Sequence, residues 1–229
     1  MKRKTCMALA MMMGLCFSVN LFANVDVNDD PQKKKYANSK FVWTDNYVVE
    51  GSNAAMAPNA GELVTTMLSK DGKPLRWVRK NDISKFGTYT GTTTLETALY
   101  NLSVDEMINN FEKDGTLRTG LYWGGVWTRD VSYSSLLALS YMCPDKVKNS
   151  LEVKVDRLGR IIQDTGTGGS WPCSSDRVVW ALSAWNIYLA TGDMDWLQKA
   201  YDIIGRSVEA DFVVVYNPQT GLFRGESSF

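Results

Sequence analysis

One Gly-rich stretch of the sequence combines the side chains that carbohydrate recognition requires. Tyr122, Trp123 and Trp127 stand beside the charged pair Arg129-Asp130. Aromatic faces cover the apolar C–H side of a sugar ring, while a guanidinium offers a fork of donors and a carboxylate offers two acceptors. We therefore predict that these five residues bind a glycan. The alternative is that Asp130 only caps the helix that begins beside it.

Two further carboxylates follow at similar spacing along the chain. Asp176 comes 46 residues after Asp130, and Glu226 comes 50 residues after Asp176. A Gly pair and a Trp precede both Asp residues, and an apolar helical pattern follows each, which indicates a repeated helical hairpin. If these loops converge on one rim, Asp176 is a further binding residue and Glu226 is a candidate general acid. Helix capping is the alternative for Asp176, and nearby Arg224 favours an ionised Glu226, which does not suit an acid.

Composition excludes several classes of function. The chain has 229 residues, a formal net charge of zero and no histidine. Without a basic field we expect no nucleic-acid partner. Without histidine there is no Ser-His-Asp triad, no Cys-His protease and no usual His-containing zinc site, so carboxylates become the first candidates for acid–base chemistry. We predict no cofactor and no metal, and the Gly-rich run at 166–169 lacks the Lys-Ser/Thr of a phosphate-binding loop.

Residues 1–23 have the pattern of a secretory signal peptide. Lys2-Arg3-Lys4 forms a basic start, residues 6–22 are uncharged and mostly apolar, and Ala23 offers a small residue for cleavage. We predict export to the periplasm or the exterior. A retained membrane anchor is an alternative, because the apolar run approaches spanning length, and lipid attachment at Cys16 is another. We expect contact with a membrane only through this segment.

The mature sequence divides into three parts. Residues 24–40 predict an exposed linker, and residues 41–90 predict a short β-rich segment with strands at 41–43, 47–49, 63–68 and 75–78. From residue 91 the apolar spacing becomes helical, with helices expected near 95–111, 130–142, 176–189 and 194–212 and a further helix somewhere between residues 145 and 163. Ser103 and Glu106 form a potential capping box, which predicts a helix start there. A further hairpin turn is expected at 217–221.

The cysteines of this helical part have two possible states, and several of its aromatic residues are expected in the core. Cys143 and Cys173 could pair in an oxidising compartment or remain buried thiols. A set of aromatic residues recurs at helical spacing among apolar neighbours, and we expect core packing for Trp180, Trp185, Tyr188 and Trp196.

The segment Trp127-Thr128-Arg129-Asp130 resembles the Trp-x-Arg-Asp motif of the glucoamylase-like six-hairpin glycosidases, a superfamily that includes debranching enzymes and trehalases. Ser175-Asp176, with the helix that ends in Tyr188 to Asp193, resembles the next inward helix of that fold. The run from Gln219 to Glu226 is similar to the loop that carries the general acid in glucoamylases. The resemblance covers roughly residues 90–229.

This resemblance implies a mainly α fold, a partial (α/α)6 toroid of helical hairpins preceded by the short β-rich segment. It implies a glycoside hydrolase that acts on α-glucosides or a related glycan by inversion, with Arg129 and Asp130 holding the sugar next to the cleaved bond. Residues 91–229 would be the N-terminal part of the domain. The family's catalytic base lies later, so we expect this fragment to lack it and to be inactive alone. A non-catalytic carbohydrate-binding protein and a helical-repeat interaction module remain alternatives.

Overall fold

The computed structural model describes residues 34–37, 41–162 and 178–224. The chain divides into two compact units, Met1–Glu106 and Met107–Phe229. The division falls within helix α2, Thr94–Asn109. Each unit has its own cluster of buried apolar side chains.

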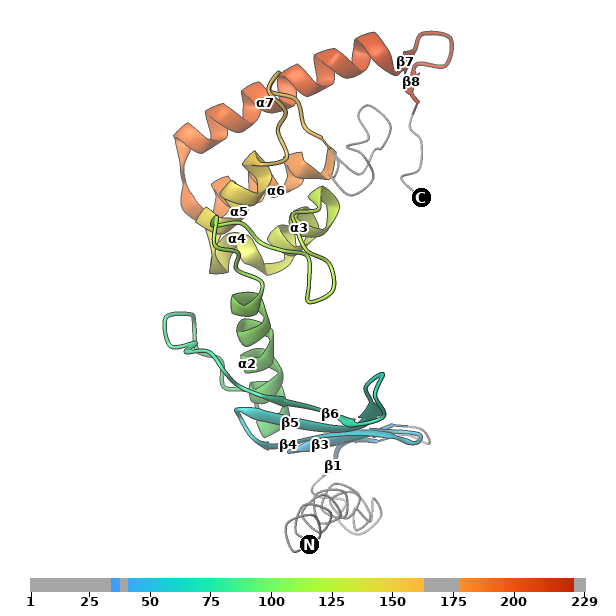
Figure 1. Ribbon diagram of the computed structural model, residues 1–229, viewed down its shortest axis with the longest axis vertical. Helices are drawn as coiled ribbons and strands as arrows, with labels where there is room; N and C mark the ends of the chain where they lie inside the picture. The colour runs from blue at the N-terminus through green and yellow to red at the C-terminus, as the bar shows by residue number, and fades with distance from the viewer. Residues whose placement is uncertain (1–33, 38–40, 163–177, 225–229) are drawn as a thin grey trace, which may run out of the picture. The chain divides into compact units, whose positions relative to one another are not determined.

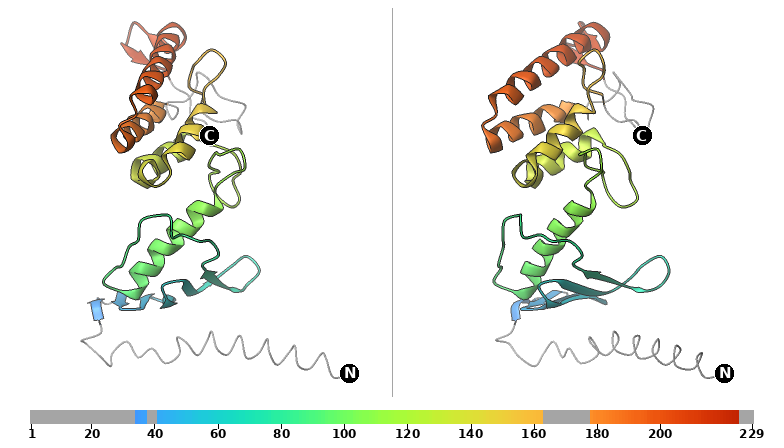
Figure 2. Two further views of the ribbon diagram at one scale, coloured as in Figure 1. Left: turned by 90° about the vertical axis from the view of Figure 1, so that its left-hand side faces the viewer. Right: turned by 60° about the vertical axis from the view of Figure 1, so that its left-hand side comes forward.

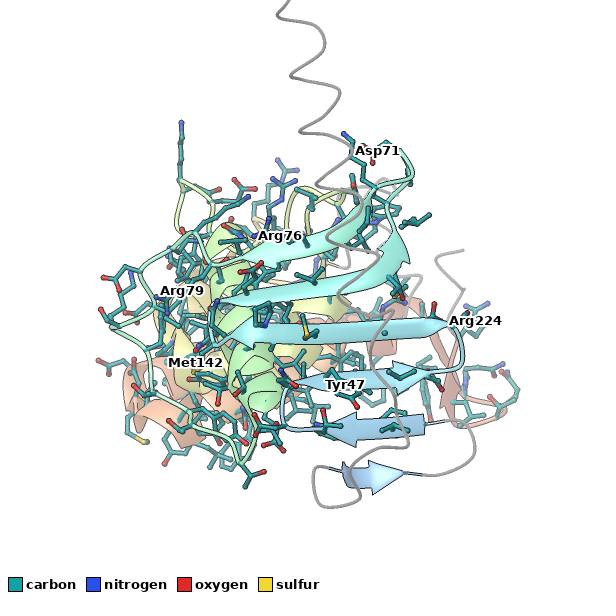
Figure 3. All side chains as sticks on the ribbon, turned by 90° about the horizontal axis from the view of Figure 1, so that it is seen from below. Tyr47, Asp71, Arg76, Arg79, Met142 and Arg224 are labelled. Carbon is teal, nitrogen blue, oxygen red and sulfur yellow. The ribbon has the colours of Figure 1, made fainter. Side chains whose placement is uncertain are left out.

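The first unit is built on a six-stranded antiparallel sheet in which every strand pairs with its neighbours in sequence. The strands are β1 (Lys34–Ala37), β2 (Phe41–Thr44), β3 (Tyr47–Glu50), β4 (Asn53–Asn59), β5 (Glu62–Leu68) and β6 (Pro74–Val78). Figure 3 shows the strands side by side, with Tyr47 on β3, Arg76 on β6 and Asp71 in the turn that joins β5 to β6. Gly72 has a φ of 74° in that turn, a conformation that glycine adopts without steric cost.

Helix α2 covers one face of this sheet (Figure 2). The shared core consists of Ala57, Leu63, Leu95 and Ala98, with Trp43, Val48, Trp77 and Leu102 packed against them. The helix begins with a capping box, because the N–H of Glu96 donates to Oγ1 of Thr93 and the N–H of Thr93 donates to the Glu96 carboxylate.

The carboxylate of Asp105 fixes α2 to the segment that follows β6. Asp105 is 1% exposed and accepts hydrogen bonds from Nε1 of Trp77 at 2.9 Å and from the N–H of Asn81 at 2.8 Å. Burial opposes ionisation, but these hydrogen bonds outweigh it and lower the pKa of Asp105. The buried acid is therefore satisfied and has a structural role.

The second unit contains helices and short hairpins (Figure 1). They are α3 (Thr128–Ser134), the π-helix η1 (Ser135–Leu139), α4 (Ser140–Met142), α5 (Pro144–Glu152), α6 (Val179–Thr191) and α7 (Met194–Val214), followed by β7 (Tyr216–Asn217) and β8 (Leu222–Phe223). Trp180 is completely buried at the centre of a cluster that also contains Val131, Val147, Leu151, Ile161, Ile187, Trp196 and Ile203.

Three short hairpins follow helix ends in the second unit, at residues 111–117 (hairpin 1), 155–161 (hairpin 2) and 216–223 (hairpin 3). Their antiparallel closing pairs are Phe111 with Leu117, Val155 with Ile161, and Tyr216 with Phe223. In each, a glycine with positive φ lies two residues before the last apolar residue: Gly115 (85°), Gly159 (77°) and Gly221 (69°).

The fold class predicted from the sequence, a mainly α partial (α/α)6 toroid preceded by a short β-rich segment, is wrong. The described residues form a six-stranded sheet covered by α2 and a separate unit of helices and hairpins, with no toroid of six helical hairpins among them. One reason is that α2 buries its apolar face against the sheet instead of against another helix. Another is β4, whose sequence Asn-Ala-Ala-Met-Ala-Pro-Asn has weak β propensity and forms a strand because it pairs on both edges.

Local predictions for the helical part are confirmed with two exceptions. The expected helices at 130–142, 176–189 and 194–212 correspond to α3–η1–α4, α6 and α7, and the turn at 217–221 joins β7 to β8. The helix start at Ser103 is wrong, because this residue lies inside α2 and its hydroxyl donates to the carbonyl of Leu99. Trp180 and Trp196 are buried as predicted, but Trp185 is 50% exposed.

Within the described residues, no helix is both long and apolar enough to cross a membrane. The signal segment at 1–23 lies outside the described residues, as does lipid attachment at Cys16.

Candidate functional site

The loop between hairpin 1 and α3 is held in shape by its own backbone and by one arginine. The N–H groups of Gly120 and Trp123 donate to each other's carbonyls at 3.2 and 3.1 Å, which closes a tight turn. Arg118 donates from Nε to the carbonyl of Gly120 at 3.0 Å and from Nη2 to that of Leu121 at 3.2 Å. Nε of Arg118 also lies 3.6 Å from a carboxylate oxygen of Glu112. These hydrogen bonds hold the tip of the loop, while Val126 near its end is buried in the core cluster of the unit.

This turn presents large side chains to solvent. Leu121, Tyr122 and Trp123 are 75%, 80% and 63% exposed. Trp123 meets Trp127 edge to face, with ring centroids 6.0 Å apart and planes at 88°. Nε1 of Trp127 donates to the carbonyl of Gly124, which fixes the half-buried ring. Exposed aromatic groups held by a rigid loop are typical of binding surfaces.

The start of α3 places the charged pair beside this aromatic surface in the chain. Trp127 is the N-cap, with extended backbone, and Thr128 is completely buried and donates to the carbonyl of Ile162 at 2.8 Å. Arg129 and Asp130 are partly exposed in the first helical turn. The alternative that Asp130 is the N-cap of this helix is wrong. The N-cap residue is Trp127, Asp130 lies in the first helical turn, and no side chain accepts a capping hydrogen bond at this helix start.

The predicted site residues are thus only partly brought together. Trp123 and Trp127 are in contact, Tyr122 adjoins Trp123 in the same turn, and Arg129 and Asp130 follow Trp127 within three residues. Asp176 and Glu226, predicted as a binding residue and a general acid, lie outside the described residues. Their placement on one rim with Asp130 remains a prediction.

The Thr191-Gly192-Asp193 segment, part of the family resemblance, caps two helices. Gly192 ends α6 with a φ of 68°, and Asp193 begins α7 by accepting from the N–H of Trp196 at 2.9 Å. Nζ of Lys148 on α5 lies 2.6 Å from the Asp193 carboxylate. The hydrogen bond from Lys148, together with that from Trp196, lowers the pKa of Asp193. These contacts explain the segment without a ligand.

Cysteine and metal chemistry receive no support in the described part of the chain. Cys143 is a free thiol whose pKa burial raises to about 11, so it stays protonated at neutral pH. Cys173 lies outside the described residues. In the ranges 34–37, 41–162 and 178–224, no group of three His, Cys, Asp or Glu side chains could hold a metal ion.

The sequence analysis missed Arg118 and Glu112, which organise the aromatic loop, and Leu121 at its exposed tip. In the sequence, Arg118 stands between two glycines, Gly115 and Gly120, but this spacing does not specify its role. An arginine that binds backbone carbonyls of its own loop cannot be distinguished in sequence from one on a solvated surface.

A search of protein-family models finds no match to this chain, and searches of curated proteins and of solved structures find none either.

Proposed function

We propose that this protein is carbohydrate-active and that the loop at 118–130 binds a glycan. One observation carries the proposal: Tyr122 and Trp123 are exposed on a loop that is fixed by backbone hydrogen bonds and by Arg118. A rigid aromatic surface binds the apolar face of a sugar at low conformational cost. The exposed aromatic residues would therefore supply the contact area.

Arg129 and Asp130 complete the recognition chemistry. A planar guanidinium and a carboxylate can each make two hydrogen bonds to neighbouring hydroxyls, which fixes the orientation of a sugar ring. The Trp123–Trp127 contact connects this pair to the aromatic surface, because Trp127 precedes Arg129 by two residues. The resemblance to the Trp-x-Arg-Asp motif supports the same roles and favours α-glucosides or a related glycan.

Glycoside hydrolysis is the activity that we propose for this site when a second carboxylate is present. Inverting cleavage needs one carboxylic acid to protonate the leaving oxygen and one carboxylate to activate water. Glu226 is our candidate for the acid. We expect Glu226→Gln to abolish turnover and to leave glycan affinity within about twofold, because the amide keeps the shape of the side chain. An equal loss of folding stability would assign Glu226 a structural role.

A non-catalytic carbohydrate-binding protein is the second candidate. The residues 118–130 contain a single carboxylate, Asp130, and the nearby Glu112 pairs with Arg118. One carboxylate is sufficient to bind a sugar but not to cleave its glycosidic bond by the two-carboxylate mechanism. Hydrolysis assays with the parent protein separate the two candidates.

Titration with linear α-glucan oligosaccharides, followed by tryptophan fluorescence and calorimetry, tests the proposed role of Asp130. We expect Asp130→Asn to weaken binding by about 10- to 100-fold, the cost of losing charge-assisted hydrogen bonds. Asp145→Asn is the matched control, because Asp145 also lies in the first turn of a helix of the same unit. Equal affinity of both variants and the parent would remove Asp130 from the site, and no binding by the parent would reject α-glucans as ligands.

A further inference from the structure

Hairpins 1 and 2 are each fixed to a later helix by a serine hydroxyl. The N–H of Leu117 donates to Oγ of Ser150 on α5, and the N–H of Ile161 donates to Oγ of Ser207 on α7, both at 2.9 Å. Each hydroxyl donates in turn to the carbonyl four residues earlier in its own helix, at 2.7 and 2.8 Å. The buried hairpin N–H groups are therefore satisfied, and both hairpins are held against the core of the unit.

Hairpin 1 leads into the aromatic part of the proposed glycan site. Arg118 directly follows the residue whose N–H Ser150 binds, and its own N–H donates to the carbonyl of Asn110 at 3.0 Å. The Arg118 guanidinium then binds two carbonyls of the loop that exposes Tyr122 and Trp123. The position of these aromatic side chains is therefore set from hairpin 1.

Hairpin 2 is joined to the charged part of the proposed site by the hydroxyl of Thr128. Ile162 directly follows hairpin 2, and its N–H donates to the carbonyl of Lys154 at 2.9 Å. The carbonyl of Ile162 accepts from Oγ1 of Thr128 at 2.8 Å, across a separation of 34 residues in sequence. Thr128 is the first residue of α3, and Arg129 and Asp130 come directly after it. The hydrogen bond therefore fastens the start of α3 to hairpin 2.

This hydrogen bond acts on the turn of helix that carries the charged pair. The first backbone bond of α3 runs from the N–H of Val131 to the carbonyl of Trp127 at 3.0 Å, and no side chain caps the helix. Thr128 and Val131 are both buried, and their spacing of three residues places them on the same side of the helix. Arg129 and Asp130 lie between them and are partly exposed. The direction of the charged side chains therefore depends on how Thr128 is held.

We propose that Thr128 is a positioning residue that orients Arg129 and Asp130 for sugar binding, and that the two parts of the glycan site are held by different hairpins. Hairpin 1 holds the aromatic side chains through Arg118, and hairpin 2 holds the charged pair through Thr128. The inference rests on the proposed function for its ligand. The hold of Thr128 on α3 is measurable without one.

Hydrogen exchange in the full chain tests the link without a ligand. Thr128→Val keeps the shape of the side chain and removes the hydroxyl, whereas Thr128→Ser keeps the hydroxyl. We expect Thr128→Val to speed exchange of the Val131 N–H by about fivefold to tenfold, because the start of α3 loses its bond to hairpin 2. Thr128→Ser should stay near the parent rate. The N–H groups of Gly120 and Trp123, which close the aromatic turn, should keep the parent rates in both variants.

A double-mutant cycle tests whether the link serves the charged pair. In titrations with linear α-glucan oligosaccharides, Thr128→Val should weaken binding by about fivefold, and Thr128→Ser by less than about twofold. In an Asp130→Asn background, Thr128→Val should change affinity by less than about twofold, because it acts through a carboxylate that is already absent. Thr191→Val is the matched control, since it removes a hydroxyl that donates to a backbone carbonyl at 2.8 Å near the end of α6.

Three results would overturn the inference while leaving the proposed function intact. The first is an unchanged Val131 exchange rate in the Thr128→Val protein. The second is equal glycan affinity of the parent and Thr128→Val proteins. The third is an equal loss from Thr128→Val with and without the Asp130 carboxylate, which would assign Thr128 a general role in stability. Absence of glycan binding by the parent protein would reject the proposed function itself, and the role of Thr128 in sugar binding with it.

Discussion

Hairpins 1 and 2 share with hairpin 3 a positive-φ glycine, an antiparallel closing pair and the backbone hydrogen bond that follows it. They differ in what surrounds them. Ile161 is buried beneath α7, while Phe223 is half exposed beside Phe212 and Tyr216. Local sequence is therefore sufficient to specify the hairpin, and the helix that follows decides whether its last residue joins the core. The same substitution should have different costs in the two environments.

The largest difference is expected for the last apolar residue. Ile161→Ala should lower the free energy of unfolding by about 2–5 kcal/mol, because it leaves a cavity in the core around Trp180. Phe223→Ala should cost less than about 1 kcal/mol, since the ring is already half exposed. Urea unfolding followed by tryptophan fluorescence measures both. Equal losses would show that hairpin 3 is as well covered as hairpin 2.

The hydroxyl that anchors a hairpin gives the next largest effect. Ser207→Ala and Ser150→Ala should each cost about 1–3 kcal/mol, because each strands a buried N–H without its acceptor. Thr220→Ala in hairpin 3 is the matched control, and should change stability by less than about 0.5 kcal/mol because its hydroxyl bonds only exposed backbone. If the Ser207→Ala protein were as stable as the Thr220→Ala protein, Ser207 would not anchor hairpin 2.

Substitution of the hairpin glycines should give a smaller difference in stability between hairpins 2 and 3. Gly159→Ala and Gly221→Ala both force alanine into positive φ, at about 1–2 kcal/mol each. Gly159→Ala must also displace the Arg206 side chain, whereas the space beside Gly221 is open. We therefore expect Gly159→Ala to be about 1 kcal/mol the more destabilising in urea unfolding, the scale of modest overpacking. A larger loss for Gly221→Ala would contradict the packing seen at Arg206.

The smallest expected difference between hairpins 2 and 3 is in how their stability changes at low pH. Burial opposes ionisation of Asp156 in hairpin 2, but hydrogen bonds from the side chain and N–H of Arg160 and from the N–H of Leu158 outweigh it and lower the pKa of Asp156 below 3.8. The ionised form therefore stabilises the folded state above about pH 4, and this contribution is lost as the pH falls through the folded-state pKa.

Hairpin 3 has the neutral Asn217 where hairpin 2 has Asp156. Amide protection in hairpin 2 should therefore decrease in acid through this group, and Asp156→Asn should remove that dependence. Exchange measured by NMR between about pH 5 and pH 3 gives the comparison. Identical pH profiles for the parent and Asp156→Asn proteins would show that Asp156 does not couple hairpin 2 to pH.

Helices and turns of the second unit were predictable because their signals are local. The periodicity of α7, the Gly192-Asp193 junction and the turn between β7 and β8 all follow from spacing and capping chemistry. The start of α2 was predicted to within one or two residues, but a second helix start was wrongly expected at Ser103, because Ser103-x-x-Glu106 has the same pattern as the true capping box at Thr93 and Glu96. The sequence alone does not show which of these two Ser/Thr-x-x-Glu patterns begins a helix. The packing of α2 against the sheet extends the helix through Ser103.

The arrangement of the first unit and the anchors of the second unit were not predictable in this way. Strand β4 depends on pairing at both edges, and residues 24–40 gave no sign of β1. Ser150 and Ser207 look like ordinary helix residues, and only the folded chain places each beside a hairpin N–H 33 or 46 residues away. For the candidate site, the aromatic and charged residues were predicted from sequence and stay a prediction, while the role of Arg118 in holding their loop depends on backbone geometry.

The proposed glycan site depends on hairpin 1, because Arg118 follows this hairpin directly and its hydrogen bonds hold the aromatic loop. The most direct test of the central claim is a glycan array that compares the parent protein with Trp123→Ala. Tyr201→Ala, which removes an aromatic side chain 73% exposed on α7, is the control. We predict that the parent and Tyr201→Ala proteins bind the same class of glycan and that Trp123→Ala loses at least about tenfold in affinity for it. No binding to any glycan, or equal binding by Trp123→Ala, would contradict the account.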